Sequence, residues 1–370
     1  MDHLKKTEEI FKGRYRFGMP WNVDLSTIQS NYKVAEKRSM LLQRRLQAND
    51  EFAQGYKKCM DKFLDHDFAR ELKPHEIDTT SNGFWYIPHH AVVNEKKKKV
   101  RVVFDCAAKH NGKSLNDHVY QGPDLVSSLV GILLRFRTRK VALIADIESM
   151  YCRVRVQPSD QKMLRFLWWK DGDYSKPPQH FCMTSHVFGA KSSACIASHA
   201  IHCAITEAEK QGKISEDSAD MARKNFYVDD FLCSTDSIED GIRIAHEITD
   251  AVMKGGFRLT KWLSNERKVI ESFDKDERAD AVKELSLDDS LPNERTLGLM
   301  LNIENDHFHY NTHIPEKPMT RRGILSMAST MFDLLGFLSP VILHPKLLVQ
   351  RLKREKLDWD DEIDDDAKKI

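Results

Sequence analysis

The stretch Phe226–Leu232 places two adjacent carboxylates, Asp229 and Asp230, inside an otherwise apolar run. An unpaired charge that is buried in an apolar strand is very costly. We therefore expect a β-hairpin whose tip carries both carboxylates to one solvent-facing point, where a divalent cation can neutralise them. The alternative is a surface turn in which the carboxylates only face water, and for an isolated Asp-Asp pair it is the stronger interpretation. The aromatic and β-branched flanks favour a held site.

Composition indicates a soluble, globular chain whose charge is unevenly placed. The 370 residues are 41% hydrophobic and 31% charged, and no apolar run approaches the roughly 20 residues that span a bilayer. The seven cysteines form no C-x-x-C pair, so neither a zinc knuckle nor a redox motif is indicated, and free thiols in a reducing compartment are expected. Net charge is only +1, but the basic runs Lys96–Arg101 and Arg135–Lys140 allow a cationic face that follows phosphates.

Hydrophobic periodicity predicts an α+β order of helices and strands. Two helices are expected within residues 32–73, and from Phe84 the period changes to that of a hairpin with a lysine-rich tip at 96–99. A solvated turn is the simplest interpretation of that tip. Arg101, however, lies within the apolar return strand, where a guanidinium needs a fixed anionic partner. We also expect an extended lead-in over 1–31, a helix beginning at 122–124, a half-exposed strand over 153–156, a helix of small residues from 192 or 193 to 208, and helical structure over 320–353.

A third carboxylate, Asp146, stands at the end of the continuous apolar strand 141–145, where a core strand meets solvent. If the sheet places it beside Asp229 and Asp230, the three carboxylates can hold two Mg²⁺ ions. Two metal ions about 3.5–4 Å apart clamp the attacking and the leaving oxygen of an in-line phosphoryl transfer. Such chemistry also needs cations for a triphosphate, which Arg101 and its neighbouring lysines could supply.

Several ordered motifs resemble the reverse transcriptase of Pao/BEL-type LTR retrotransposons, from about Tyr15 to the last residue. Tyr227–Asp230 matches the hairpin motif of reverse transcriptases, and Val141–Asp146 with Tyr151 matches the other metal-binding motif. Further stretches similar to Pao/BEL signatures are Trp85–Val93, Arg101–Asp105, Ser114–Asp117, Leu133–Arg137, Lys261–Asn265, Thr296–Gly298 and Leu335–Pro340. Several motifs in one order are far more specific than a single Tyr-Val-Asp-Asp.

The resemblance implies an α+β right-hand polymerase with fingers, a palm whose antiparallel sheet is backed by helices, and a partial thumb. The implied activity is that of an RNA-directed DNA polymerase, a nucleotidyltransferase that joins dNTPs to a primer 3′-OH with two Mg²⁺ ions, for which Mn²⁺ could substitute. The implied domains are an N-terminal lead-in with helices over 1–75, fingers over 76–140, a palm over 141–265, a primer-grip region over 266–319, and the start of a thumb or connection over 320–370.

Individual residues take on roles from the same resemblance. The implied metal ligands and catalytic carboxylates are Asp146, Asp229 and Asp230, with the Ile147 carbonyl as a further ligand. The implied nucleotide-binding residues are Arg101, Tyr151, Phe188 and Gly189, and the implied primer grip is Leu297 with Gly298. Tyr151 would exclude a ribose 2′-OH, and Lys261 would protonate the pyrophosphate leaving group. The alternatives are a core aromatic for Tyr151 and an exposed strand lysine for Lys261.

Some positions depart from the family pattern, namely Ala194, Leu334 and Met300–Leu301, although none removes a metal ligand. These departures leave open the alternative that the chain is a catalytically inactive, nucleic-acid-binding remnant of a retroelement polyprotein. Another two-metal palm enzyme, such as a nucleotidyl cyclase, is disfavoured by Tyr151, the basic hairpin and the thumb-like helices.

The resemblance also implies partners and a location. The expected partners are an RNA or DNA template with its primer, dNTPs, and the RNase H and integrase domains of the same polyprotein, with no membrane. We expect the chain to be a fragment of that polyprotein or a gene model cut from one, and the implied location is a cytoplasmic virus-like particle.

Overall fold

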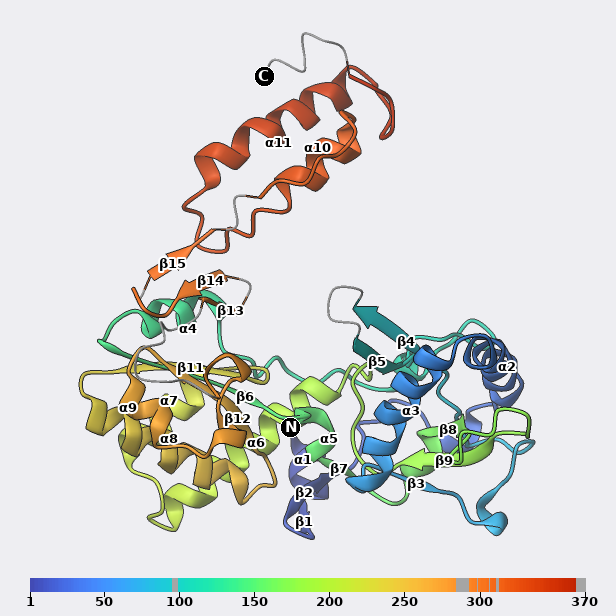
Figure 1. Cartoon of the computed structure of the whole chain (residues 1–370). Helices are drawn as coiled ribbons and strands as arrows, with labels where there is room; N and C mark the ends of the chain where they lie inside the picture. The colour runs from blue at the N-terminus through green and yellow to red at the C-terminus, as the bar shows by residue number, and fades with distance from the viewer. Residues whose placement is uncertain (95–98, 284–292, 298, 306, 311–312, 364–370) are drawn as a thin grey trace. The chain divides into compact units, whose positions relative to one another are not determined.

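The computed structural model in Figure 1 describes the chain except for residues 95–98, 284–292, 298, 306, 311–312 and 364–370. Lys96–Lys98 of the expected cationic tip therefore lie outside the described residues. The chain forms two compact units. The first unit comprises Met1–Ser127, Asp146–Phe231 and Arg243–Leu259, and the second comprises Ser128–Ala145, Leu232–Ile242 and Thr260–Ile370.

The first unit begins with a short helix and a hairpin and continues into packed helices and small sheets. Its helices are α1 (Asp2–Thr7), α2 (Tyr32–Ala48), α3 (Asp50–Asp65), α5 (Met150–Arg153), α6 (Ser193–Lys210) and α7 (Glu216–Asn225). Its strands are β1 (Glu9–Phe11), β2 (Arg14–Phe17), β3 (Ala69–Glu71), β4 (His89–Asn94), β5 (Lys99–Phe104), β7 (Arg155–Val156), β8 (Arg165–Trp168), β9 (Gln179–Met183) and β10 (Phe226–Tyr227). Within it the strands are ordered β1-β2-β7, β3-β9-β8 and β4-β5.

A four-stranded sheet, ordered β10-β11-β6-β12, contributes residues to both units. The elements that pass from one unit to the other are β6 (Val141–Ile147), β11 (Asp230–Thr235), α8 (Ile238–Met253) and β12 (Leu259–Ser264). Every residue of β6 is buried except the half-buried Asp146. The remaining elements of the second unit are α4 (Leu129–Phe136), α9 (Arg267–Glu271), β13 (Asn293–Thr296), β14 (Leu299–Asn302), β15 (His307–His309), α10 (Arg321–Ala328) and α11 (Ser339–Arg354).

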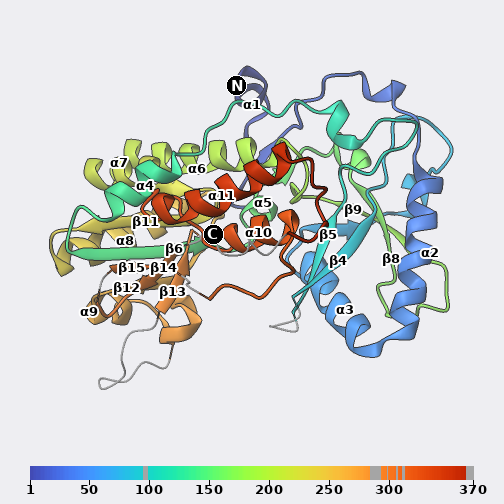
Figure 2. The same cartoon turned by 90° about the horizontal axis from the view of Figure 1, so that it is seen from above.

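The core of the first unit is organised around the buried segment Trp85–Ile87, whose side chains are at most 2% exposed. The Asn31 side chain accepts a hydrogen bond from the Tyr86 N–H and donates one to the Tyr86 carbonyl, both at 2.7 Å. A bridge from Tyr86 to Arg165 places the segment beside β8. Figure 2 shows α2 and α3 next to β4, β5 and β8. The start of α2 is therefore tied by one buried amide to the strand-like segment that precedes the β4–β5 hairpin.

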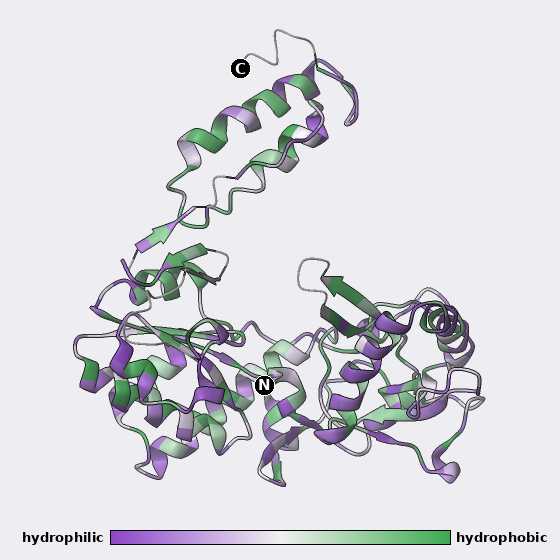
Figure 3. Ribbon diagram, viewed as in Figure 1, coloured by the Kyte–Doolittle hydropathy of each residue, from purple (hydrophilic) through white to green (hydrophobic). Residues whose placement is uncertain are grey.

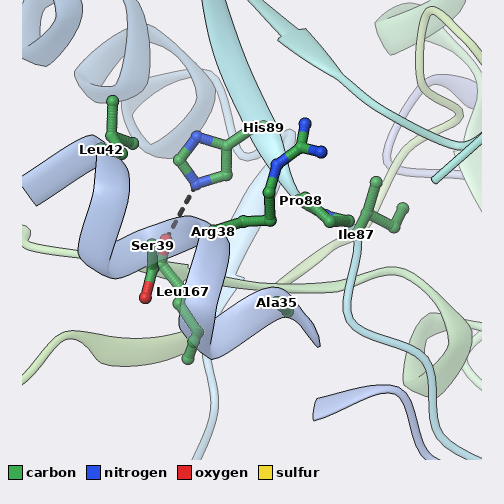
Figure 4. Close-up of a pocket in the computed structure, with 8 residues that line it drawn as sticks. All are labelled: Ala35, Arg38, Ser39, Leu42, Ile87, Pro88, His89 and Leu167. Carbon is green, nitrogen blue, oxygen red and sulfur yellow. Dashed lines mark hydrogen bonds between the residues drawn. The ribbon is translucent and has the colours of Figure 1, made fainter. Parts of the chain in front are cut away.

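His89 anchors the base of the β4–β5 hairpin in this core. Its Nε2 lies 2.8 Å from the Leu167 carbonyl oxygen (Figure 4), and its Nδ1 faces the Tyr56 hydroxyl. Burial lowers the pKa of His89 to about 4, so the ring is neutral near pH 7. Farther along β4 the side chains of Val92 and Val93 are exposed, and Figure 3 shows the hairpin as largely hydrophobic. The hairpin is thus fixed at its base and presents an apolar surface beyond it.

In the second unit, the helices α10 and α11 pack against each other and against the segment that follows them. Buried side chains at this contact are Ile324, Leu348, Leu352 and Ile363. The Arg321 guanidinium lies 4.5 Å from the centre of the Trp359 ring, and Arg322 pairs with Asp360 at 2.7 Å. None of the helices in the described part of the chain is long and apolar enough to cross a membrane.

Several predicted elements differ from the structure because short elements depend on tertiary contacts. The lead-in over 1–31 contains α1 and the β1–β2 hairpin, and the helix expected at 122–124 begins at Leu129. The segment 153–156 is not a half-exposed strand, because β7 is buried and Arg155 pairs with Asp67 at 2.5 Å. The helical stretch over 320–353 is two helices, interrupted over residues 329–338.

The buried, neutral His89 predicts a pH dependence of stability. Because its pKa is about 4 when folded and near 6.5 when unfolded, the unfolded chain binds a proton that the folded chain excludes. This contribution is present above about pH 6.5 and is lost as the pH falls toward 4. We expect the free energy of unfolding of His89→Gln to fall less over this range, by on the order of 3 kcal/mol. Urea unfolding at pH 7 and at pH 4.5 measures the difference.

The exposed His75 supplies the control, since His75→Gln should keep the pH dependence of the wild-type chain. An equal loss of stability in His89→Gln and the wild-type chain would contradict the prediction.

Candidate active site

The expected hairpin at Phe226–Leu232 is present, with a two-residue turn. Tyr227 pairs with Asp230 across β10 and β11, which leaves Val228 and Asp229 as the turn. Val228 has a φ of +57°, a conformation that is strained for a β-branched residue. Strain of this kind persists only where the surrounding structure holds it, and it clusters at functional sites. The turn therefore presents Asp229 to solvent at a fixed point, while Asp230 is half-buried.

One backbone hydrogen bond joins this turn to the end of β6. The Ile147 N–H donates to the Asp229 carbonyl oxygen at 2.8 Å. Asp146, which precedes Ile147, is half-buried at the same end of the strand. The contact brings Asp146 to the neighbourhood of Asp229 and Asp230, as the sequence predicts. Carboxylate oxygens are ligands that Mg²⁺ prefers.

Tyr151 follows directly after β6, on the short helix α5. Ser149, at the start of α5, has a left-handed backbone with φ +55°, which turns the chain sharply after the strand. The half-buried Tyr151 ring lies 5.6 Å from the ring of Phe188, which is 66% exposed. Burial, and secondly the negative charge of Asp229, raise the pKa of Tyr151. Tyr151 thus lies beside the Phe188 ring and within electrostatic reach of the Asp229 carboxylate.

The backbone conformation and the neighbours of residue 189 require a glycine at this position. Its φ is +115°, and a Cβ at this position would lie 2.6 Å from the Phe104 carbonyl oxygen, at the end of β5. The Asn116 side chain donates to the Gly189 carbonyl at 3.0 Å and accepts from the Lys191 N–H at 2.9 Å. The segment that carries Phe188 is therefore held by two backbone contacts. Sequence reasoning noted Asn116 only as part of the Ser114–Asp117 motif and missed this positioning role.

Arg101 does not lie where the sequence predicts. The pattern of its strand suggested a guanidinium within an apolar layer that needs a fixed anionic partner, but the structure places Arg101 on the exposed face of β5. Its register partner is Val92, which is also exposed. Water can solvate the guanidinium there, so the physical argument for a fixed partner fails. An exposed Arg101 remains able to meet a phosphate that approaches from solvent.

The other predicted residues belong to the second unit. Lys261 is exposed on β12, with a φ of +58°. Leu297 is half-buried, has a φ of +48° and follows Thr296, which pairs with Leu299. Leu297 thus follows β13, which pairs with β14, whereas Gly298 lies outside the described residues. The roles in protonation and primer grip stay predictions.

Comparison with known proteins gives a partial family match and a fold. Residues 320–370 match the family described as Pao retrotransposon-like RNaseH-like domain. A search of curated proteins found no match. A solved structure of foamy viral protease-reverse transcriptase dRH with double-stranded DNA is 14% identical, with a TM-score of 0.54, over 82% of this chain and 44% of that chain. A structure of the foamy viral protease-reverse transcriptase with an RNA/DNA hybrid is 12% identical, with a TM-score of 0.51, over 95% of this chain and 39% of that chain.

This chain therefore spans less than half the length of those two foamy viral chains. At such low identity the likeness concerns the fold, and it confirms the expected α+β, right-hand polymerase-like fold. Together with the match of residues 320–370, it supports the relation to a Pao/BEL-type retroelement polyprotein that the sequence motifs indicate.

The electrostatic link between Tyr151 and Asp229 is testable without a substrate. In Asp229→Asn the pKa of Tyr151 should fall, because one of the two causes that raise it is removed. It should stay above the ordinary tyrosine value, since burial is the larger cause. NMR titration of ¹³C-labelled tyrosine, assigned with Tyr151→Phe, measures the pKa.

Asp220→Asn, on the exposed side of α7, should leave the pKa of Tyr151 unchanged. An unchanged value in Asp229→Asn as well would mean that the Asp229 carboxylate does not face Tyr151.

Proposed function

We propose that this chain is the RNA-directed DNA polymerase of a Pao/BEL-type retroelement, which joins dNTPs to a primer 3′-OH. The observation that carries the proposal is the hydrogen bond from Ile147 to Asp229, which gathers Asp146 and the Asp229–Asp230 turn at one end of the sheet. The relation to retroelement polyproteins and the reverse transcriptase fold support it.

The donor set fits Mg²⁺, because all three side chains offer hard oxygen ligands that are open to solvent at least in part. Asp146, Asp229 and Asp230 would hold two ions, with the Ile147 carbonyl as a further ligand. Such ions activate the attacking hydroxyl and stabilise the charge of the leaving group when they are bound. The task of the three carboxylates is then to hold their oxygens at a fixed separation, which the strained Val228 turn and the buried β6 favour.

The aromatic pair fits the recognition of a deoxynucleotide. The Tyr151 ring is tilted by 46° against the Phe188 ring, and the Asn116 side chain bonds the Gly189 carbonyl and the Lys191 N–H, which follow Phe188 in the chain. A ring fixed in this way can meet the sugar of an incoming nucleotide and leave no room for a 2′-OH. Gly189 allows the backbone to pass close to β5, whose exposed Arg101 would bind the triphosphate.

Two further roles rest on the resemblance. Lys261 would protonate the pyrophosphate leaving group, and its exposed side chain is available to solvent. Leu297 and Gly298 would hold the primer. The foamy viral structures contain double-stranded DNA or an RNA/DNA hybrid, and we propose a primer–template duplex as the partner of this chain.

Primer extension tests the polymerase proposal directly. With a poly(rA)/oligo(dT) substrate, Mg²⁺ and dTTP, the wild-type chain should extend the primer. In Asp229→Asn the rate should fall by at least 100-fold, because one metal ligand loses its charge. The control is Asp220→Asn, which should keep the wild-type rate.

Tight, salt-sensitive binding of the primer–template without extension would overturn the polymerase proposal in favour of an inactive nucleic-acid-binding remnant. Extension that persists in Asp229→Asn would remove the hairpin from the proposed site.

The proposed role of Tyr151 predicts a change in sugar selectivity. Tyr151→Ala should raise the ratio of rTTP to dTTP incorporation by about 10-fold or more, because the loss of the ring opens space for a 2′-OH. Tyr151→Phe retains the ring and should keep the wild-type ratio. Single-nucleotide extension with each triphosphate gives both values of kcat/KM. If Tyr151→Ala lowers both values equally, Tyr151 serves packing against Phe188 and not selectivity.

A further inference from the structure

A second cluster of metal-ligating side chains lies in the first unit, apart from the three aspartates. It consists of Glu8, His199 and Cys203. Cys203 Sγ lies 3.6 Å from His199 Nε2 and 3.7 Å from Glu8 Oε2, and the Nε2 and Oε2 atoms are 3.8 Å apart. The three ligand atoms therefore form a nearly equilateral triangle. The His199–Glu8 separation is too long for a direct hydrogen bond.

This triangle has nearly the size that a tetrahedral zinc ion requires. With Zn–S near 2.3 Å and Zn–N and Zn–O near 2.0–2.2 Å, tetrahedral angles place ligand atoms about 3.4–3.6 Å apart. The observed separations exceed this by a few tenths of an ångström, which small side-chain rotations can close. A set of one sulfur, one nitrogen and one oxygen suits Zn²⁺ and does not suit Mg²⁺, which prefers oxygen ligands.

The fold builds this triangle from two segments that are far apart in the sequence. His199 and Cys203 lie one turn apart on α6, so their side chains share one face of the helix. Glu8 directly follows α1 and has an extended backbone. The Phe17 ring, on β2, lies 5.4 Å from the His199 ring and packs against it. His199 itself is only 8% exposed, so its ring is held in position.

A cavity of about 360 Å³ adjoins the cluster and gives an ion both access and room for a fourth ligand. Its lining also includes Tyr15, His202, Glu207, Lys5 and Lys210. Water could complete the tetrahedron as the fourth ligand. Lys5 and Lys210 balance the negative charges of Glu8 and Glu207. A divalent cation and a Cys203 thiolate would then leave only a small net positive charge at the site.

We propose that Glu8, His199 and Cys203 form a zinc site that fastens the N-terminal segment to α6. Binding is coupled to folding, because the ligands come together only in the folded chain. The Cys203 thiol releases its proton to solvent as the Zn–S bond forms, so no redox partner is needed. No sequence motif predicts this site, because the cysteines form no C-x-x-C pair and Glu8 lies far from α6 in the chain. The proposal is independent of the polymerase proposal.

The metal ion alone provides the test. The full chain, freed of metal with a chelator, is titrated with Co²⁺ and then with Zn²⁺. A thiolate ligand gives a charge-transfer absorption with Co²⁺ that the three aspartates cannot give, because they contain no sulfur. We expect one such site per chain, displacement of Co²⁺ by Zn²⁺, and a rise of several degrees in Tm on zinc binding.

The variants assign the ligands. Cys203→Ser should abolish the charge-transfer band. Glu8→Gln should weaken zinc binding by at least 10-fold, and the fold should tolerate it because Glu8 is exposed. Cys59→Ser, a half-buried thiol on α3, is the control and should behave as the wild-type chain. Absence of the band in the wild-type chain, or wild-type zinc affinity in Glu8→Gln, would overturn the proposal, whether or not the chain extends a primer.

Discussion

The hydrogen bond between the Ile147 N–H and the Asp229 carbonyl is the contact on which the candidate active site depends. It joins a buried apolar strand to a turn that would otherwise be free to relax. The turn holds Val228 at a positive φ, which costs on the order of 1–3 kcal/mol. Strand pairing of Tyr227 with Asp230, and the packing of Phe226 on Phe231 at 5.0 Å between ring centres, offset that cost. Remote apolar packing thus fixes the position of exposed carboxylates.

A second set of contacts extends this control to the aromatic pair. Gly189 packs so closely against the end of β5 that a Cβ would not fit. The Asn116 side chain forms hydrogen bonds with the backbone on both sides of residue 190. The base of the β4–β5 hairpin is fixed in turn by His89, between Tyr56 and Leu167. His89 is the register partner of Phe104 across the hairpin, and Phe104 is the residue that Gly189 packs against. These are all contacts within the first unit.

The sequence predicted those parts of the fold whose pattern repeats over many residues. The helices α2, α3 and α6, the strand β6 and the β10–β11 hairpin all have a clear hydrophobic period or a charged tip. The short elements α1, β1 and β2 escaped prediction, because they have too few residues for a period and are stabilised by contacts with distant segments.

The same distinction holds for individual side chains. Asp146 and Asp229 could be predicted because a carboxylate beside an apolar strand is unusual in the sequence itself. The exposure of Arg101 and the burial of Arg155 could not, since an alternating or apolar strand does not reveal which face is covered. The roles of Asn116 and of the Glu8–His199–Cys203 cluster depend on pairs of residues that only the fold brings together.

Two sets of metal-ligating groups in one chain raise the question of how each would obtain its ion. Zinc binds nitrogen and sulfur donors far more strongly than magnesium does, whereas abundant magnesium occupies open oxygen sites. The proposed site of the three aspartates is partly open to solvent and offers only oxygen, so a divalent ion held there would exchange readily. Cys203 and the buried His199 offer softer donors from one rigid helix. Ligand chemistry and rigidity would therefore keep the exchangeable catalytic ions and a permanent structural ion apart.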